Sequence, residues 1–492
     1  MLFTIENDYS AIATVITDTK RACSAVELRS RCDGLIEDLQ RYGIASLGLY
    51  ANNSIDWVVA DLACQKADIC ILPVPTFFSL SQIEHALTTC QFDALLTDNP
   101  EVLATLVNIG GEHLGKVSSC NLDLILLKSK HVDSSFPEGT GKITFTSGST
   151  GQPRGVCLSN AQLRRQANAL AQTVALQSPR HLCLLPLSTL LENVAGVYAP
   201  LLAGGSLVVP TQESLGFRGS SLVDQQKLIA TISKTEPDSI ILVPQLLLLL
   251  VAAISRGWKP PQSLKFIAVG GSKVSAKLLN QARSLGLPVY EGYGLSECCS
   301  VVSLNTAQAN RPGSCGRPLQ YSQLSFEEGE VCVAGNAMLG YTNEPETWNQ
   351  SMIRTGDLGH LDFEGFLHID GRKKNLLISS FGRNISPEWV ESELLVSPLL
   401  SEAVVLGDAQ PYCTALVTAR SSQTSDSELE RWIGSVNQQL PDYARIKCWH
   451  RLSRPLAEQQ GLLTENGRPK RERINKVFAT EIENLYGEQA VA

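Results

Sequence analysis

Short apolar runs alternate with helix-like patterns along most of the chain, and this alternation constrains the fold most strongly. Strands that alternate with helices indicate parallel strands joined by crossover helices. We therefore expect an α/β fold, with a large N-terminal domain of parallel or mixed sheets and flanking helices. The predicted strands are Ser46–Leu49, Ile69–Pro73, Ala94–Thr97, His181–Leu185, Ser206–Pro210, Ser239–Val243 and Phe266–Val269, and the clearest helices are Trp57–Lys66 and Leu80–Cys90.

The chain changes character toward its C-terminal end. Short strand-like runs with Gly and Asn turns over about residues 315–373 predict a β-rich subregion that completes the large domain, residues 1–373. A charged segment then precedes a separate helix signal, in which Ser386 suits an N-cap and Pro387 the first helical position. We predict a small α+β domain over residues 374–492.

The composition excludes several classes of protein. With 41 Lys and Arg against 49 Asp and Glu in 492 residues, the net charge of -8 provides no basic field, so we expect no nucleic-acid partner. The start of the chain lacks the basic and apolar regions of a signal peptide, so we expect a cytoplasmic protein whose 14 cysteines are reduced core residues. The most apolar stretch, Ile240–Ile254, is shorter than the roughly 20 residues of a membrane-spanning helix. It predicts a buried strand that runs into a helix, and no transmembrane segment is expected.

The segment from Ile143 to Gly155 has the composition of a phosphate-binding loop. A β-prone run leads into three hydroxyl residues and two glycines, which are followed by a cation. Glycines let backbone N–H groups approach an anion closely, hydroxyls donate further hydrogen bonds, and an arginine can hold phosphate oxygens in pairs. The spacing fits neither a Walker A loop nor a dinucleotide-binding fingerprint. The residues predicted to hold a polyphosphate are Thr146, Ser147, Gly148, Ser149, Thr150, Gly151 and Arg154.

Four further motifs follow the loop in order. They are Tyr290-Glu-Gly-Tyr-Gly-Leu-Ser-Glu297, Thr355-Gly-Asp-Leu-Gly359, Asp370-Gly-Arg-Lys-Lys-Asn375 and Ser380-Phe-Gly-Arg-Asn-Ile-Ser-Pro-Glu388. Together they resemble the acyl-adenylate-forming superfamily, which includes acyl-CoA synthetases, adenylation domains of nonribosomal peptide synthetases, and luciferases. The resemblance covers roughly residues 30–480, and the segment Leu185–Gly204 is most similar to the long-chain acyl-CoA synthetase branch.

The resemblance implies ATP-dependent activation of a carboxylic acid to acyl-AMP with release of pyrophosphate. The protein then has to position two anions and offset their repulsion with cations, hydrogen-bond donors and a metal ion. By resemblance, Tyr293 stacks on adenine, Ser296 contacts the α-phosphate, Glu297 binds Mg²⁺, and Asp357 accepts hydrogen bonds from the ribose. The other residues expected at the nucleotide are Gly270, Gly271, Glu291, Gly292, Gly294, Ile369 and Arg372.

Two positions depart from the superfamily pattern. The phosphate loop usually carries Lys where this chain has Arg154, which keeps the charge but is a planar fork rather than a point charge. The superfamily's catalytic lysine normally follows a Gly that matches Gly467, and this chain has Arg468 there. Lys470 lies two residues further on and is the alternative. The sequence leaves open which of the two reaches the α-phosphate.

The small domain is the part expected to move. In the superfamily it rotates at a hinge between an adenylating and a thioester-forming orientation. The matching hinge residue is Lys374, and Arg383 lies in the segment that the second orientation presents to the active site. Such rotation lets one pocket complete two catalytic sets in turn.

The acyl group is predicted to be hydrophobic. No Asp occurs between His181 and Ser214 to pair with a substrate ammonium group, which disfavours free amino acids. The run Leu190–Tyr198 is mostly apolar, and burial of an aliphatic tail gains about 0.8 kcal/mol per CH₂. The same run fits an ordinary core helix, and Glu192 could instead contact a polar group. The predicted pocket residues are Leu190, Asn193, Val194, Val197 and Leu295.

Three functions remain open from the sequence. The first is an AMP-forming acid–thiol ligase that uses ATP and Mg²⁺ to join a fatty or other hydrophobic small-molecule acid to CoA. The second keeps adenylation but delivers the acyl group to the phosphopantetheine of an acyl carrier protein or to another nucleophile, or stops at acyl-AMP. The third, suggested by Arg154 and Arg468 in place of two lysines, is a protein that binds nucleotide or acyl ligand without turnover.

Overall fold

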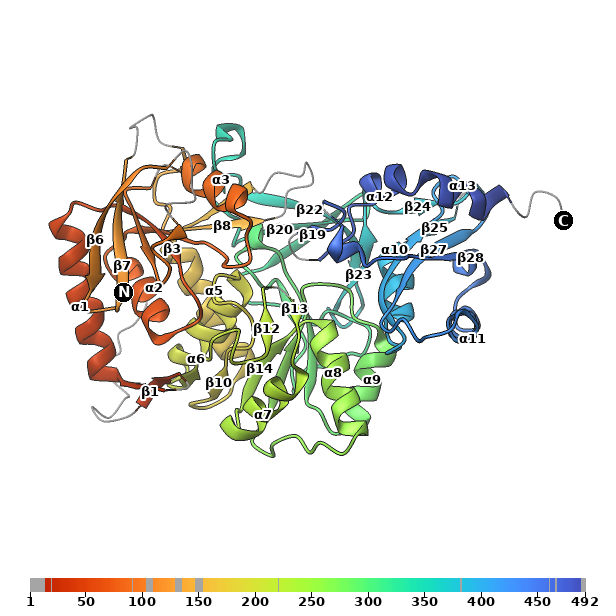
Figure 1. Ribbon diagram of the computed structural model, residues 1–492, viewed down its shortest axis with the longest axis horizontal. Coiled ribbons are helices and arrows are strands. Elements are labelled where there is room, and N and C mark those ends of the chain that lie inside the picture. The colour runs from red at the N-terminus through yellow and green to blue at the C-terminus, as the bar shows by residue number, and fades with distance from the viewer. Residues whose placement is uncertain are drawn as a thin grey trace.

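A computed structural model of the chain confirms the predicted α/β class, with a large N-terminal sheet domain and a small C-terminal domain (Figure 1). The small domain forms one end of the molecule. The structure describes residues 14–18, 20–90, 92–102, 109–128, 135–146, 154–219, 221–380, 383–459, 461–464 and 467–487.

The first large sheet contains the strand that leads into the predicted phosphate loop. Strands β3, β4, β5 and β8 run parallel, so their carboxyl ends lie at one edge of the sheet. Antiparallel strands complete both sides of the sheet. The strand order is β21 (Gly340–Tyr341), β9 (Arg154–Leu158), β8 (Lys142–Thr146), β4 (Cys70–Pro73), β3 (Ser46–Tyr50), β5 (Ala94–Thr97), β7 (Leu122–Leu127) and β6 (Gly111–Val117).

The second large sheet carries the first of the four ordered motifs. Its central strands from β16 to β1 are parallel, and antiparallel strands close both edges. The strand order is β18 (Arg317–Pro318), β17 (Ser303–Leu304), β16 (Val289–Tyr293), β15 (Phe266–Val269), β14 (Ser239–Leu242), β10 (Arg180–Leu182), β11 (Ser206–Val208), β1 (Thr14–Thr17) and β2 (Ala22–Ser24).

The main hydrophobic core joins residues of both large sheets with helices between and around them. Helix α2 (Ile55–Lys66) is buried at every residue from Ile55 through Gln65, and most of its residues are apolar, with Asp56, Asp61 and Gln65 as buried polar exceptions. The apolar stretch Ile240–Ile254 forms β14 followed by α8, as predicted. The other helices of this domain are α1 (Ala25–Arg41), α3 (Leu80–Cys90), α5 (Asn160–Val174), α6 (Ala199–Leu202), α7 (Gln225–Thr235), α8 (Pro244–Ser255) and α9 (Ala276–Ser284).

An antiparallel sheet forms the β-rich part of the large domain. Its order is β19 (Gln323–Glu327), β20 (Glu330–Ala334), β22 (Met352–Leu361) and β23 (Leu367–Arg372). Strands β22 and β23 carry the second motif and the start of the third. Strand β23 leads directly into the small domain.

The small domain has its own cores, on both faces of a three-stranded sheet. Helix α10 begins at Pro387 with Ser386 at the N-cap position, although the Ser386 hydroxyl makes no capping bond. The elements are β24 (Leu377–Ile378), β25 (Asn384–Ile385), α10 (Pro387–Leu394), β26 (Leu400–Leu406), β27 (Cys413–Ala419), α11 (Asp426–Asn437), β28 (Ile446–Arg451), α12 (Arg471–Val477) and α13 (Ala479–Gly487).

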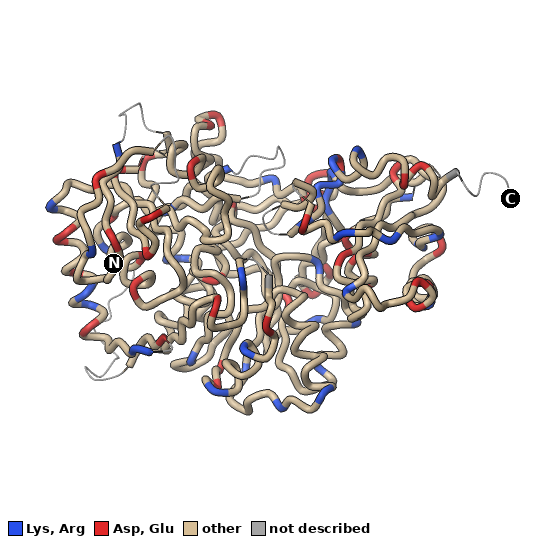
Figure 2. Tube along the Cα trace, in the orientation of Figure 1, with Lys and Arg blue, Asp and Glu red and all other residues tan. Residues whose placement is uncertain are grey.

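The cysteines lie in the packed cores, and charged residues of both signs are spread along the chain. All 14 cysteines are free, and all except the partly exposed Cys448 are buried, as predicted for small core residues. Lysine and arginine are interspersed with aspartate and glutamate along the chain (Figure 2). In the part of the chain that the structure describes, no helix has both the length and the apolar character needed to cross a membrane.

Candidate nucleotide-binding site

The centre of the candidate site is a buried carboxylate, Asp357, on β22. The strand pairing of β22 with β23 sets Asp357 opposite Arg372, and Arg372 Nε lies 2.7 Å from Asp357 Oδ1. The hydroxyl of Tyr293, at the end of β16, donates to Asp357 Oδ2 over 2.6 Å. Burial raises the pKa of Asp357, and the charge of Arg372 opposes that rise. Burial and the same carboxylate raise the pKa of Tyr293, so its phenol keeps its proton. Three predicted nucleotide residues from separate motifs are thus in direct contact.

The Thr355-Gly356-Asp357 tripeptide gives the carboxylate its position. Gly356 has a φ of +71°, which a residue without a side chain adopts most easily. The Thr355 hydroxyl donates to Val331 O over 2.8 Å and accepts the Asp357 N–H over 3.1 Å. Thr355 was not among the predicted site residues, although it belongs to the motif that pointed to Asp357.

Arg468 reaches this carboxylate region from the small domain. The segment around it turns back on itself, because Thr464 N–H donates to Arg468 O over 2.7 Å and Arg468 N–H donates to Thr464 Oγ1 over 3.0 Å. The guanidinium donates to Gly271 O in the loop after β15. Desolvation lowers the pKa of Arg468, with nearby Arg372 as the second cause. Asp357 and Glu388 act against that shift.

Lys470, the alternative to Arg468, is the residue before α12. Its backbone N–H donates to Leu462 O over 2.8 Å, and its carbonyl accepts N–H groups from the first turn of that helix. The contacts described for Lys470 are therefore those of a helix N-terminus. Of the two candidates, Arg468 is the one with a described contact to a residue predicted at the nucleotide, the hydrogen bond to Gly271 O.

The predicted metal ligand and the predicted phosphate cation lie close to each other. Glu297 follows β16 in a short 3-10 helix that also contains Ser296. The Tyr341 hydroxyl donates to Glu297 Oε1 over 2.9 Å, and the Arg154 guanidinium lies 3.5 Å from the centre of the Tyr341 ring. Arg154 also forms a two-point ion pair with Glu344. Tyr341 and Glu344 belong to none of the predicted motifs, and no spacing in the sequence indicates them.

The structure describes only part of the predicted phosphate loop, which begins at the end of β8. Thr146 is the last residue of that strand. The predicted contacts at Ser147, Gly148, Ser149, Thr150 and Gly151 lie outside the described residues.

The glycines predicted at the nucleotide lie at the ends of β15 and β16 and in the turns that follow them. A side chain at Gly294 would lie 1.7 Å from Ser300 O, so only glycine fits this turn. Gly270 and Gly292 approach each other closely, since a Cβ on Gly270 would lie 3.0 Å from Gly292 O. Ile369, on β23, accepts a hydrogen bond from Lys273 Nζ over 2.6 Å through its backbone carbonyl. Lys273 was missed by the sequence analysis because it stands outside every motif.

Glu291 lies on β16 and is 5% exposed. Burial raises the pKa of Glu291 to about 7, with Lys273 and Arg283 opposing the shift. A carboxyl group of this kind changes charge near neutral pH.

The predicted acyl-pocket residues lie in the core. Val194 and Val197 are 0% exposed and Leu190 is 5% exposed, while Leu295 is partly buried against the same core. This segment does not line an open pocket, and it is not an ordinary α-helix. Residues Glu192–Tyr198 form a π-helix, in which Ala199 N–H donates to Val194 O. An acyl pocket lined by these residues stays a prediction.

Asn193 belongs to a buried polar network. Its amide oxygen accepts from Lys142 Nζ over 2.5 Å, and its amide nitrogen donates to Asp61 Oδ2 over 3.0 Å. Lys142 also donates to Asp61 Oδ1 over 2.5 Å and to the Tyr198 hydroxyl over 2.7 Å. In this structure Asn193 therefore holds the π-helix against α2 and β8.

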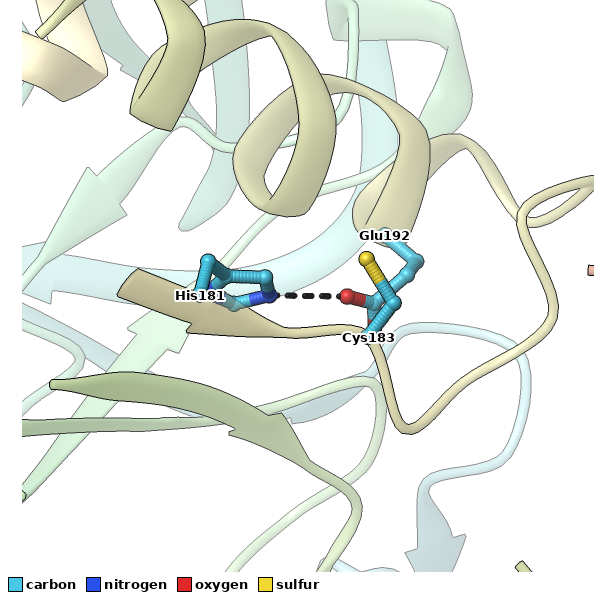
Figure 3. A group of neighbouring side chains, drawn as sticks. All are labelled: His181, Cys183 and Glu192. Carbon is cyan, nitrogen blue, oxygen red and sulfur yellow. Dashed lines mark hydrogen bonds and ion pairs between the residues drawn. The ribbon is translucent and has the colours of Figure 1, made fainter. Parts of the chain in front are cut away.

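Glu192 belongs to a second buried group with His181 and Cys183 (Figure 3). His181 Nε2 lies 2.9 Å from Glu192 Oε1, and Leu185 N–H donates to Glu192 Oε2 over 3.1 Å. The ligand-type atoms of these three residues lie within 4.8 Å of one another. Both Glu192 oxygens are nevertheless bonded to the protein, and a Cβ on Gly196 would lie 2.2 Å from Oε1. We interpret the group as a structural contact that fixes the start of the π-helix.

The turn that leads into the small domain follows β23, which carries the predicted site residues Ile369 and Arg372. Lys374 is exposed in the turn after β23, and its neighbour Asn375 donates to Glu388 Oε1 on α10 over 2.6 Å. Arg383 is exposed next to β25.

A separate cavity of about 450 Å³ opens at the carboxyl ends of β3, β4 and β5, and no predicted site residue lines it.

Comparisons with known proteins identify the class. A model of the AMP-binding enzyme family matches residues 6–342, and a model of the AMP-binding enzyme C-terminal domain matches residues 374–490. The chain is 23% identical to the long-chain-fatty-acid–CoA ligase FadD15 of Mycobacterium bovis, over 96% of this chain and 93% of that protein. It is 28% identical to the 2-succinylbenzoate–CoA ligase of Bacillus licheniformis, over 82% and 85%. The structure resembles that of o-succinylbenzoate CoA synthetase MenE from Bacillus subtilis in complex with ATP and magnesium, with a TM-score of 0.75, 23% identity and coverage of 94% and 96%.

The fold and the motifs thus define an adenylate-forming enzyme. The chain belongs to the AMP-binding enzyme family, and the acid–CoA ligases named above are among its relatives. The resemblance to the acyl-adenylate-forming superfamily is confirmed.

Proposed function

We propose that this protein activates a fatty or other hydrophobic carboxylic acid as acyl-AMP and transfers the acyl group to CoA. The observation that carries the proposal is the direct contact of Tyr293 and Arg372 with Asp357, together with the hydrogen bond from Arg468 of the small domain to Gly271 O. These residues come from separate parts of the chain. The similarity to the FadD15 ligase over nearly the whole of both chains supports a long-chain acid, whereas the similarity to 2-succinylbenzoate–CoA ligases leaves aromatic acids as a group to be tested.

In the proposed reaction Asp357 accepts hydrogen bonds from the ribose, and Tyr293 packs on the adenine. Arg372 and Arg468 lie near each other, so an anion between the two guanidinium groups relieves their repulsion. We propose that Arg468 takes the place of the superfamily's lysine at the α-phosphate. Its fork can bind a phosphate oxygen and the acyl oxygen together.

The residues present fit a magnesium ion at Glu297. A carboxylate is the hard oxygen ligand that Mg²⁺ prefers, and Tyr341 orients this one. When bound, the ion neutralises charge on the phosphate oxygens. Arg154, next to it in space, adds a fixed positive charge for the leaving pyrophosphate.

We further propose that residues 374–492 rotate about Lys374 to exchange Arg468 for Arg383 at the active site. The two cores of the small domain allow it to move as a unit. Ser275 Oγ donates to Glu393 Oε1 over 3.0 Å, and this contact joins the two domains in the present orientation.

The test is acid-dependent release of pyrophosphate with ATP and Mg²⁺ across a panel of fatty, aromatic and short-chain acids. Glu297→Ala should reduce release at least about a hundredfold, while the exposed Glu138→Gln should not. The absence of release above background with every acid would refute the adenylation. Intact-mass measurement of CoA and of a carrier protein after the reaction identifies the acceptor, and acylated carrier with unmodified CoA would refute transfer to CoA.

A further inference from the structure

A row of four side chains connects the predicted phosphate cation to the predicted metal ligand. Glu344 holds the Nε and Nη2 edge of Arg154 with both carboxylate oxygens. The face of the Arg154 guanidinium lies against the Tyr341 ring, and the Tyr341 hydroxyl donates to Glu297 Oε1. Glu344 and Arg154 are 190 residues apart in the chain.

The backbone fixes Glu344 in this place. Strand β21 pairs with β9, so that Tyr341 lies opposite Val156, and Thr342 N–H donates to Gly155 O over 2.9 Å. The turn that follows is closed on itself, because Thr347 N–H donates to Glu344 O over 2.9 Å and Thr347 Oγ1 accepts from Tyr341 N–H over 3.0 Å. Glu344 is therefore presented to Arg154 by a turn that is hydrogen-bonded at both ends.

An arginine needs such a partner more than a lysine does. A lysine ammonium is a point charge that can turn freely, whereas a guanidinium binds a phosphate only when its plane and its free edge face the oxygens. The Tyr341 ring fixes the plane of Arg154, and the Glu344 carboxylate fixes its rotation within that plane. Since Glu344 occupies one edge, the opposite edge of the fork is the one presented for another anion.

The pair contributes little to folding by itself. The Arg154 and Glu344 side chains are 33% and 30% exposed, and ion pairs open to solvent to this degree are weak. A conformational role accounts for the two-point geometry better than a stabilising one.

We propose that Glu344 is a positioning residue for nucleotide binding, which orients Arg154 toward the polyphosphate without touching the nucleotide. The inference rests on the proposed function, because it requires that ATP occupies the site. It explains how this chain uses arginine at a position where its superfamily usually has lysine.

The experiment is a double-mutant cycle on the full chain, read out as binding of a non-hydrolysable ATP analogue with Mg²⁺ and as the KM for ATP. Glu344→Gln keeps the size of the side chain but has one acceptor oxygen instead of two and no charge, so it cannot hold Arg154 at two points. We therefore expect binding to weaken and KM to rise about five- to tenfold with kcat nearly unchanged. The melting temperature should stay within about 3 °C of wild type. Glu346→Gln, exposed in the same turn, is the matched control and should behave as wild type.

The second half of the cycle separates orientation from charge. In an Arg154→Lys background, Glu344→Gln should change binding less than about twofold, because a lysine does not need its plane fixed. Equal effects in both backgrounds, or tighter analogue binding by Glu344→Gln, would overturn the proposal. A wild-type protein that binds the analogue but releases no pyrophosphate with any acid would refute the proposed reaction and leave the result on Glu344 intact.

Discussion

Asp357 and Arg372 face each other across β22 and β23, with Arg372 Nε 2.7 Å from Asp357 Oδ1. The strand register sets this contact, so it is present before any ligand arrives. Asp357 is 4% exposed, and the Tyr293 hydroxyl occupies its second oxygen. We propose that the pair and the tyrosine together form a preorganised platform for a nucleoside.

Replacement of the carboxylate on this platform should weaken nucleotide binding. Asp357→Asn keeps the shape but removes the charge that pairs with Arg372 and the strong acceptor proposed for the ribose. We expect the KM for ATP to rise at least about tenfold, since charged acceptors contribute more than neutral ones. Steady-state kinetics at saturating acid measure this change. The matched control is Asp370→Asn on β23, where the carboxylate is 60% exposed, and an equal effect of both changes would contradict the role of Asp357.

The contact between Arg468 and Gly271 O predicts which residue replaces the missing lysine. Arg468→Ala should slow acyl-AMP formation about 100- to 1000-fold, the usual loss when one charge-stabilising group is removed. Lys470→Ala should reduce it less than about threefold, because Lys470 is placed at the start of α12. Single-turnover formation of acyl-AMP distinguishes the two. A larger loss in Lys470→Ala would show that the small domain adopts a different register during catalysis.

The strands and helices around the site were predictable because they follow local patterns. Parallel strands buried between helices are apolar over their whole length, and the helices alternate with them at short intervals. The motif residues were predictable for another reason, because Asp357, Arg372 and Tyr293 each stand in a recognisable segment. Strand register brings Asp357 and Arg372 together, and the end of β16 adds the Tyr293 hydroxyl.

The contacts that the sequence did not reveal depend on pairings between distant segments. Glu344 reaches Arg154 only because β21 adds to β9 at the edge of the first sheet. Lys142 and Asp61 are 81 residues apart and meet inside the core. The π-helix that contains Asn193 also depends on distant segments. Its first residues, Glu192 and Asn193, bond to His181 and Lys142, and local sequence propensity does not encode these contacts.

The buried lysine offers a test of this packing. Lys142 is 0% exposed, and burial lowers its pKa while Asp61 opposes the shift. Lys142→Met should lower the free energy of unfolding by about 3–5 kcal/mol, because it leaves the Asp61 charge buried without its cation. Adding Asp61→Asn should restore part of that loss, since the double variant has no uncompensated charge. Urea unfolding of the three variants measures the difference, and a double variant that loses the sum of both single changes would contradict the pairing.

Glu291 predicts how stability depends on pH. Its pKa is raised from 4.5 to about 7 by burial, so between these two values the folded protein keeps a proton that the unfolded chain has released. The unfolded state then binds fewer protons, and the free energy of unfolding must fall as the pH rises through this window, by roughly 3 kcal/mol in total. Above about pH 7 both states are ionised and the contribution of Glu291 no longer changes.

Glu291→Gln removes this titration and isolates its effect. Relative to wild type, the variant should gain stability as the pH is raised from 5 to 8, with the difference approaching roughly 3 kcal/mol in urea unfolding. Glu138→Gln, at an exposed position, should show no such trend. A stability difference between Glu291→Gln and wild type that is independent of pH would mean that the folded protein holds Glu291 ionised through this range, with Lys273 and Arg283 outweighing the cost of burial.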